Sequence, residues 1–246
     1  MRFFVEFSYK GSNYHGWQKQ PQVITVQKEL DNALTIILNN KIETVGAGRT
    51  DSGVHAKQMF AHFDFQFSFD IDATINKLNR FLPKDILIHT IFKVNDNASS
   101  RFDAISRTYQ YYIINQKNPF NKNAYLLYNK LDVDLMNIAC GYILGKQDFT
   151  SFSKSHTQTF TNNCDVISAS WQILNNELIF TIKADRFLRN MVRAIVGTLI
   201  EVGLGKIEPI KIKDIIAKKN RGEAGASVPA HALFLTRVEY SKDIIA

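Results

Sequence analysis

The residues best suited to chemistry lie in one short segment, GRTDSGVHA, at positions 48–56. Its single carboxylate, Asp51, stands among small residues, with Arg49 two positions before it and Gly53 two positions after it. Glycine frees the backbone, and Asp and Ser side chains bond nearby backbone groups, so this spacing favours a tight loop. Such a loop can present one carboxylate to a substrate, although the same pattern also occurs in Asx turns without chemistry.

Motifs for other chemistries are missing from the sequence. It has no Walker loop, GxSxG or HExxH motif, and GAG at 46–48 lacks the third glycine of a dinucleotide fingerprint. His55 and His62 are close in sequence to Asp64, but a metal site needs three or four convergent ligands that we cannot assemble. We therefore expect hydrogen-bonded strand histidines, and carboxylate chemistry with neither a metal nor a cofactor.

Composition narrows the partner and the compartment. The chain has 246 residues and a formal net charge of +7, which favours a polyanionic partner such as nucleic acid. Its two cysteines, Cys140 and Cys164, form no CxxC pair, so we expect buried, reduced thiols in a cytoplasmic protein. Glu6 interrupts the N-terminal apolar run, and no run is long enough to span a membrane.

Hydrophobic periodicity in the first part of the chain predicts strands and two helices. Thr25 is the expected N-cap of the first helix, and Pro83 follows the second. One face of the strand 57–67 is expected to carry Met59, Ala61, Phe63, Phe65 and Phe67. The predicted strands are 2–9, 42–45, 57–67 and 86–94, and the predicted helices are 26–38 and 71–81.

The second part of the chain repeats these patterns. Asp132 is a candidate N-cap for a helix that ends at Gly145, and Asn175-Asn176 is typical of a hairpin turn. The other predicted helices are 187–202 and 209–219, and the predicted strands are 108–115, 164–174, 178–184 and 231–240.

This order of elements predicts an α+β fold with antiparallel hairpins, in two halves of similar content. We place the N-terminal half, with the Asp51 loop, at 1–104. The C-terminal half is placed at 105–246.

Two further features could contribute to a site. Tyr109 lies in an aromatic strand, RTYQYY at 107–112, where packing is the ordinary role. Arg186, Arg189 and Arg193 recur along the predicted helix 187–202 and its start, and Arg186 and Arg193 would share one face. That face is either solvated or directed at phosphates or a carboxylate.

GRTDSGVHA closely resembles the active-site motif of the TruA family of tRNA pseudouridine synthases. Further blocks resemble that family in the same order and cover nearly the whole chain: YKGSNYHGWQ (9–18), TVQ (25–27), SRFDA with RTY (100–109), DFTSF (148–152), MVRAIVG (191–197) and PAHALFL (229–235). Three positions depart from the family pattern. Ser52 and Ala232 replace Ala and Gly, and the segment before Arg101 lacks the usual His.

The resemblance implies isomerisation of uridine to pseudouridine at positions 38, 39 and 40 of the tRNA anticodon stem-loop, after base flipping. It implies Asp51 as nucleophile, attacking either C6 of the base or C1′ of the sugar, with Arg193 favouring the ionised carboxylate. Tyr109 would remove the C5 proton or stack on the uracil, and Leu233 would pack on the ring. Arg49 and Arg101 would bind substrate.

The resemblance also implies the pseudouridine synthase fold, in which two similar halves with mainly antiparallel sheets flanked by helices surround a central cleft, completed here by the half at 105–246. It further implies a cofactor-free homodimer that binds the anticodon arm of tRNA. We expect phosphate contacts from basic residues outside the motif loop: Lys154, Arg186, Arg189, Lys218, Lys219 and Arg221. Two alternatives are a retaining glycosidase, which needs a second carboxylate such as Asp64 or Asp103, and a non-catalytic RNA-binding module.

Overall fold

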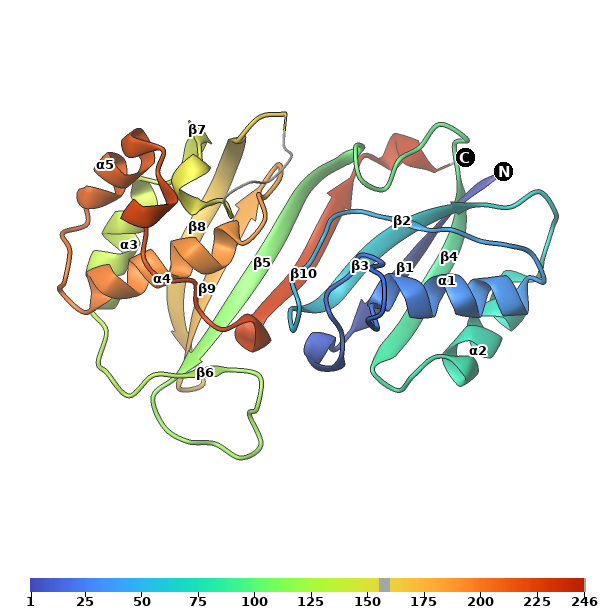
Figure 1. The fold of residues 1–246 in the computed structure, drawn as a ribbon, viewed down its shortest axis with the longest axis horizontal. Helices are drawn as coiled ribbons and strands as arrows, with labels where there is room; N and C mark the ends of the chain where they lie inside the picture. The colour runs from blue at the N-terminus through green and yellow to red at the C-terminus, as the bar shows by residue number, and fades with distance from the viewer. Residues whose placement is uncertain (155–159, 246) are drawn as a thin grey trace. The chain divides into compact units, whose positions relative to one another are not determined.

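The computed structural model describes residues 1–154 and 160–245, and the chain divides into two units (Figure 1). Unit 1 comprises Met1–Ile105 and Leu235–Ala246, and unit 2 comprises Ser106–Phe234. The chain thus leaves unit 1 once and returns to it for its last strand. The division into functional halves at residues 104 and 105 stays a prediction.

Unit 1 is built on a sheet with the strand order β4-β1-β3-β10. Its strands are β1 (Arg2–Tyr9), β3 (His55–Asp64), β4 (Ile86–Val94) and β10 (Leu233–Tyr240), and the short β2 (Val45–Gly46) pairs with β3. β1 runs antiparallel to both β3 and β4. Phe4, Phe7 and Phe63 are fully buried, so the aromatic strand residues form the core of this unit.

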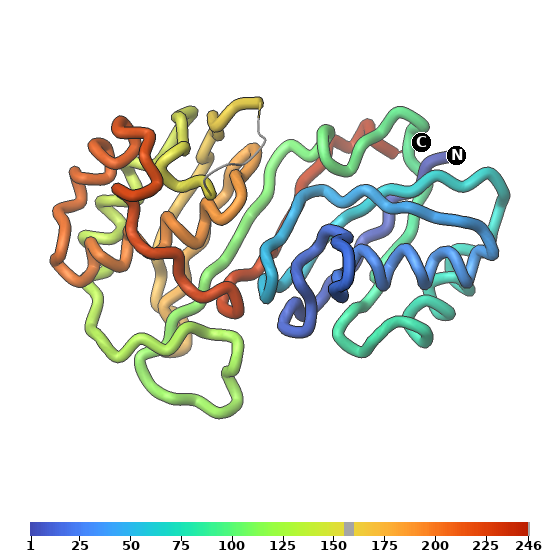
Figure 2. The backbone as a smooth tube through the Cα atoms, viewed as in Figure 1, coloured from blue at the N-terminus to red at the C-terminus, as the bar shows by residue number. Residues whose placement is uncertain are grey.

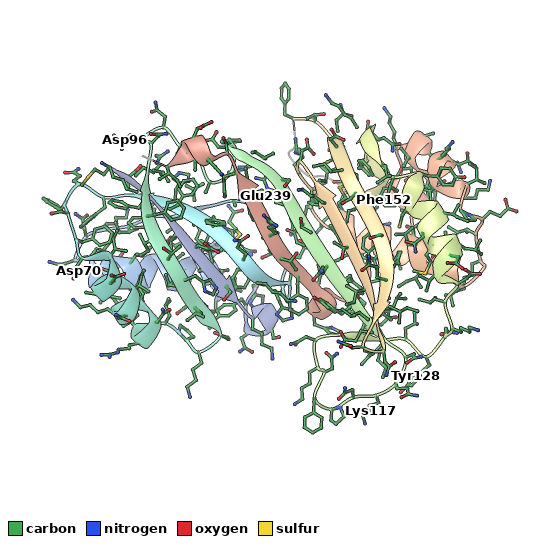
Figure 3. The ribbon with its side chains drawn as sticks, turned by 180° about the vertical axis from the view of Figure 1, so that it is seen from behind. Asp70, Asp96, Lys117, Tyr128, Phe152 and Glu239 are labelled. Atoms are coloured by element: carbon green, nitrogen blue, oxygen red, sulfur yellow. The ribbon has the colours of Figure 1, made fainter. Side chains whose placement is uncertain are left out.

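Two helices cover one face of the unit 1 sheet (Figure 1). α1 (Val26–Ile37) begins where the Thr25 hydroxyl accepts a hydrogen bond from the Lys28 N–H at 3.3 Å. α2 (Ile71–Phe81) begins at Asp70, labelled in Figure 3, whose carboxylate accepts from the Ala73 N–H at 2.9 Å. The Thr25 cap, helix 71–81 and strands 2–9 and 86–94 confirm the sequence-based predictions.

Unit 2 contains the strands that follow in the sheet order, β5-β9-β8-β7. Its strands are β5 (Ala104–Ile114), β7 (Gly145–Asp148), β8 (Asn163–Leu174) and β9 (Glu177–Ala184). The short β6 (Tyr125–Leu126) pairs in parallel with the end of β5, and a wide loop connects the two (Figure 2). The β8–β9 hairpin turns at Asn175 and Asn176, which have φ values of 51° and 64°, as their sequence predicts.

The helices of unit 2 are α3 (Val133–Gly141), α4 (Met191–Gly203) and α5 (Lys211–Lys218). α3 packs against both α4 and β8. Short 3-10 turns occupy Gly11–Asn13, Thr150–Phe152, Arg221–Glu223, Ala230–Ala232 and Lys242–Ile244. Helices and mainly antiparallel strands in each unit confirm the α+β class.

Two strand predictions in unit 1 need correction. Only Val45–Gly46 pairs as a strand, because side chains of α1 take the preceding backbone groups: the Ile42 N–H donates to the Thr35 hydroxyl at 3.0 Å. β3 ends at Asp64 and not at Phe67, so Phe67 lies beyond the strand, and its side chain is 61% exposed.

Three predictions in the second part of the chain also need correction. α3 ends at Gly141, and Gly145, with a φ of 82°, begins β7. α4 begins four residues later than predicted because Asn190 has a left-handed φ of 67°, which cannot continue a helix. Arg186 and Arg189 therefore lie outside α4 and share no helix face with Arg193. The last strand begins at Leu233, after a 3-10 turn that contains His231.

Candidate active site

The Asp51 loop joins β2 to β3 and is anchored on the residues that flank the carboxylate. Thr50 and Val54 are buried, whereas Asp51 between them is partly exposed. The Tyr9 hydroxyl lies 2.8 Å from the Thr50 hydroxyl, and the Trp17 N–H donates to the Thr50 carbonyl at 3.3 Å. Within the loop, the Val54 N–H donates to the Asp51 carbonyl at 3.1 Å, as in a tight turn. The backbone around the carboxylate is thus fixed.

The carbonyl of Tyr14 braces the other side of this loop. It accepts one hydrogen bond from the Gly53 N–H at 3.3 Å and another from the Ser52 hydroxyl at 3.2 Å. Gly53 has a φ of 81°, a conformation that side-chain-bearing residues rarely adopt. The serine that departs from the family pattern at position 52 therefore adds a brace of its own.

Two glycines let the segment 11–16 approach the loop closely. A Cβ atom on Gly11 would lie 2.0 Å from the Val54 carbonyl oxygen, and one on Gly16 would lie 2.5 Å from that of Thr50. The Gly11 N–H donates at 2.9 Å to Nδ1 of His55, a side chain that is only 1% exposed. These contacts join residues about forty positions apart, and no sequence pattern indicated them.

Side chains of α1 hold the chain where it enters the loop. The Asp31 carboxylate accepts from both the N–H and the hydroxyl of Thr44, at 2.9 and 2.7 Å. The Gln27 side-chain amide donates to the Thr44 carbonyl at 2.7 Å. Burial raises the pKa of Asp31 despite these bonds, because desolvation disfavours the charged form. Gln27, from the block TVQ at 25–27, and Asp31 thus hold the backbone just before β2, which leads into the Asp51 loop.

Two more predicted site residues lie in the same unit as Asp51. Arg49 and Arg101 are both exposed. The Arg101 guanidinium carbon lies 5.2 Å from the centre of the Phe102 ring.

The remaining predicted site residues belong to unit 2. Tyr109 lies on β5, opposite Ile182, and its ring meets that of Phe187 edge-on with centroids 5.1 Å apart. Arg193 lies in the first turn of α4 and donates from Nε to the Val228 carbonyl at 2.7 Å. Leu233 is 5% exposed at the start of β10.

The carboxylates considered for a glycosidase pair have structural partners. Asp64 forms a bidentate ion pair with Arg2, at 2.9 and 2.8 Å, and this bond lowers the pKa of its carboxyl. A general acid needs a raised pKa, so Asp64 is poorly suited to that role. Asp103 accepts from the Ser99 N–H at 2.8 Å and so organises its own turn.

The two cysteines and the strand histidine His62 behave as the sequence predicts. Burial raises the pKa of both the Cys140 and Cys164 thiols to about 12, so they remain protonated and poorly nucleophilic at neutral pH. Burial lowers the pKa of His62, whose Nδ1 lies 2.9 Å from the Ser100 hydroxyl, confirming a hydrogen-bonded strand histidine. In the part of the chain that the structure describes, no three or more His, Cys, Asp or Glu side chains are grouped to hold a metal ion.

Several basic residues expected to contact phosphates have partners within the protein. Lys218 pairs with Glu223 at 2.7 Å, and Lys219 pairs with Asp148 at 3.0 Å. Arg221 donates to the Ala224 carbonyl and the Ser227 hydroxyl, at 3.1 and 2.9 Å. A phosphate would have to compete with these bonds.

Among residues 1–154 and 160–245, no helix is long and apolar enough to cross a membrane.

Comparison with known proteins gives matches of high coverage. A family model described as tRNA pseudouridine synthase matches residues 139–241. The chain is 49% identical over 245 residues to tRNA pseudouridine synthase A of Parabacteroides distasonis, covering 99% of this chain and 97% of the relative. It is 50% identical over 240 residues to that of Azobacteroides pseudotrichonymphae, with 97% and 96% coverage.

A more distant relative matches over nearly the same length. Identity to tRNA pseudouridine synthase A of Francisella tularensis is 39% over 241 residues, with 97% of this chain and 93% of the relative covered. Among solved structures, a chain from the crystal structure of a Cbf5-Nop10-Gar1 complex aligns with 95% of this chain and 58% of its own length. Its TM-score of 0.35 and identity of 12% are too low to carry an argument.

Proposed function

This chain belongs to the tRNA pseudouridine synthase A family, and from that premise we propose that it isomerises uridines 38, 39 and 40 of the tRNA anticodon stem-loop with Asp51 as its nucleophile. Family membership makes it a tRNA pseudouridine synthase, an isomerase that acts on uridine in tRNA. The observation that carries the proposed nucleophile is the loop itself. A partly exposed carboxylate stands on a backbone held by Tyr9, Tyr14 and Trp17.

A braced carboxylate suits this reaction because covalent catalysis divides one difficult step into two easier ones. The N1–C1′ bond of uridine breaks, and a C5–C1′ bond forms in its place. N1 gains a proton and C5 loses one, so product and substrate have the same atoms. Asp51 can open this sequence by attacking C6 of the base or C1′ of the sugar, and its Oδ leaves again when the C-glycoside is complete.

The other site residues receive roles from the resemblance. Arg49 and Arg101 bind the substrate in this proposal, and Arg193 favours the ionised form of the nucleophile. Leu233 packs on the uracil ring. Tyr109 removes the C5 proton or stacks on the uracil, and its edge-on contact with Phe187 gives its ring a defined orientation for either role.

The proposal extends to the assembly and the compartment. The family resemblance supports a homodimer that binds the anticodon arm and works in the cytoplasm, where tRNA is matured. Analytical ultracentrifugation of the purified chain tests the dimer. If the chain is a monomer at micromolar concentration, the proposed homodimer is refuted, and the assignment of Asp51 as the nucleophile is unaffected.

The decisive experiment measures tritium release from 5-tritiated uridine in tRNA transcripts. Each transcript carries uridine at only one of positions 38, 39 and 40 and cytidine at the other two. We expect conversion by the wild-type chain, without added metal or nucleotide. Asp51→Asn should abolish conversion while tRNA binding persists, because the amide is no nucleophile but keeps the size of the carboxylate. Asp134→Asn, at an exposed position in the first turn of α3, is the matched control.

Each outcome separates one part of the proposal from the rest. Conversion by Asp51→Asn at the wild-type rate would remove Asp51 as the nucleophile. Conversion only at uridines outside 38–40 would exclude the anticodon arm as the target site but would still show that the chain is a pseudouridine synthase. Binding without conversion at any uridine of total tRNA would favour the RNA-binding module.

A further inference from the structure

A tight turn at residues 99–103 holds an aromatic ring out in solvent. The side chain of Phe102 is 78% exposed, and the Arg101 guanidinium lies over its ring, 5.2 Å from the ring centre. Single exposed apolar residues are common on protein surfaces, so exposure alone carries no meaning. What sets Phe102 apart is the combination of the guanidinium over its ring and the bonding that fixes the turn beneath it.

The turn is closed by hydrogen bonds of its own. The Ser99 N–H donates to the Asp103 carboxylate at 2.8 Å, and the Asp103 N–H donates to the Ser99 carbonyl at 3.1 Å. The Phe102 N–H donates to the Ser99 hydroxyl at 3.3 Å. Ser99 and Asp103 thus fix the backbone that bears the exposed ring.

A buried residue within the turn fastens it to the sheet of unit 1. Ser100 is 0% exposed and bonds three separate elements. Its N–H donates to Nδ1 of His62 on β3 at 3.1 Å, and its hydroxyl donates to the Val45 carbonyl on β2 at 2.6 Å. Its carbonyl accepts from the Tyr240 hydroxyl on β10 at 2.6 Å. Buried polar groups that are fully satisfied make a rigid anchor.

A rigid, exposed aromatic ring beside a guanidinium has the chemistry of a nucleobase contact. Unpaired bases stack on aromatic side chains and on the planar guanidinium of Arg, and an exposed π-face accepts any base. A ring carried on a backbone that is already fixed loses less entropy when a base covers it. The net charge of +7 and the family's tRNA substrate make nucleic acid the fitting occupant.

We propose that Arg101 and Phe102 form a preassembled stacking platform for one unpaired nucleobase of the tRNA substrate. The base lies on the Phe102 ring, and the guanidinium supplies the adjacent positive charge. Phe102 acts in binding and takes no part in bond making or breaking. The inference rests on the proposed function only in that tRNA is the ligand, and it is independent of Asp51 as the nucleophile.

A tryptophan reporter tests the platform directly. The native tryptophans, Trp17 and Trp171, are each 3% exposed, so a Phe102→Trp variant adds the only solvent-accessible indole. We expect unmodified tRNA to quench the emission of this introduced indole and to shield it from acrylamide, because a stacked base covers the ring. Phe67→Trp, at a site 61% exposed in the same unit, is the matched control and should keep its acrylamide accessibility.

Affinity measurements give a second readout. Phe102→Ala should weaken tRNA binding by about five- to 150-fold, the range found when one stacked base is lost. The loss should appear mainly in Kd and KM rather than in the single-turnover rate at saturating tRNA. Phe102→Tyr keeps the ring and should restore most of the affinity, whereas Phe102→Leu keeps only the apolar surface and should not. Thermal unfolding checks that each variant remains folded.

The outcomes that overturn the platform are distinct from those that overturn the proposed function. If tRNA binds the Phe102→Trp variant and leaves the emission and accessibility of the introduced indole unchanged, the stacking platform is refuted. The proposed enzymatic function is unaffected by that result. If that indole is shielded in the free protein, in a concentration-dependent way, the ring belongs to an interface with a second copy. A wild-type chain that binds no tRNA refutes the proposed function itself.

Discussion

The backbone N–H of Gly11 donates to Nδ1 of His55 at 2.9 Å, which links the first segment after β1 to the residue that follows the Asp51 loop. An imidazole nitrogen that accepts from an N–H must carry its lone pair, so this bond requires Nδ1 without a proton. His55 is 1% exposed, and losing the bond would leave a buried N–H unsatisfied. We therefore expect His55 to position the Asp51 loop.

Two amide variants separate this bond from mere packing at position 55. The Asn side-chain oxygen can occupy the place of Nδ1, whereas that of Gln corresponds to Nε2. His55→Asn should thus keep the bond and lose less than about tenfold in kcat. His55→Gln should lose about 100-fold, as expected when the reacting carboxylate is displaced by about 1 Å. Steady-state kinetics with a tRNA binding assay measures both, and equal losses in the two variants would contradict the positioning role.

The close approach of Gly11 to the loop gives a second prediction. A Cβ on Gly11 would meet the Val54 carbonyl oxygen at 2.0 Å, whereas one on Gly48 would have nothing within 4 Å. Gly11→Ala must push the two segments apart, so it should lower the free energy of unfolding by about 1–3 kcal/mol and also lower kcat. Gly48→Ala should change the free energy of unfolding by less than about 1 kcal/mol. Urea unfolding compares them, and equal stability of the two variants would show that the loop adapts.

The charge of the protein predicts a strong dependence of tRNA binding on salt. Each phosphate contact releases counterions, so log affinity falls linearly with log salt. For six or more contacts, we expect the Kd to rise by at least about 100-fold between 50 and 200 mM salt. Arg49→Gln should reduce the slope by about one unit. Lys211→Gln, which removes only an exposed pair with Asp214 at 3.1 Å, should leave the slope unchanged. A Kd that is insensitive to salt would refute phosphate contacts as the main source of affinity.

Short sequence patterns predicted the helix caps and the hairpin turn correctly, because residues close together in the chain determine them. Thr25 and Asp132 cap the helices that follow them, and Asn175-Asn176 turns the hairpin, because these side chains and φ values act within a few residues. The start of α4 could not be predicted in the same way. Leu188 is buried and keeps the apolar spacing of the helix, but the left-handed φ of Asn190 interrupts the backbone.

The sequence patterns did not predict contacts between residues that are far apart in the chain. Ile42 reads as the start of a strand, yet its N–H bonds to Thr35 of α1 instead of to another strand. The Asp51 loop is recognisable from its Gly and Asp spacing, but its braces come from Gly11 and Tyr14. Nothing in the periodicity of either segment indicates that contact. The roles of Asp51, Tyr109 and Arg193 remain predictions.

Asp31 provides a prediction about pH, because its pKa is raised by burial. A carboxyl whose pKa is higher in the folded than in the unfolded protein binds protons more tightly when folded. Its contribution to stability is therefore fully present below the unfolded value of about 3.9, and is lost as pH rises through the folded value. At neutral pH the ionised Asp31 thus costs stability, although Thr44 and, at 3.9 Å, Lys19 partly offset this cost.

Two variants at position 31 test this sign. The Oδ1 atom accepts both bonds from Thr44, so Asp31→Asn can keep both acceptor contacts while removing the charge. The free energy of unfolding of Asp31→Asn should match or exceed that of the wild type at pH 7. As the pH falls toward 4, the free energy of unfolding of the wild type should rise relative to that of Asp31→Asn. Asp31→Ala leaves both Thr44 donors without their acceptor and should lose about 1–3 kcal/mol of unfolding free energy at any pH. Urea unfolding between pH 4 and 7 measures this difference in the free energy of unfolding. If the wild type instead becomes less stable relative to Asp31→Asn on acidification, the pKa of Asp31 is lowered by folding and not raised.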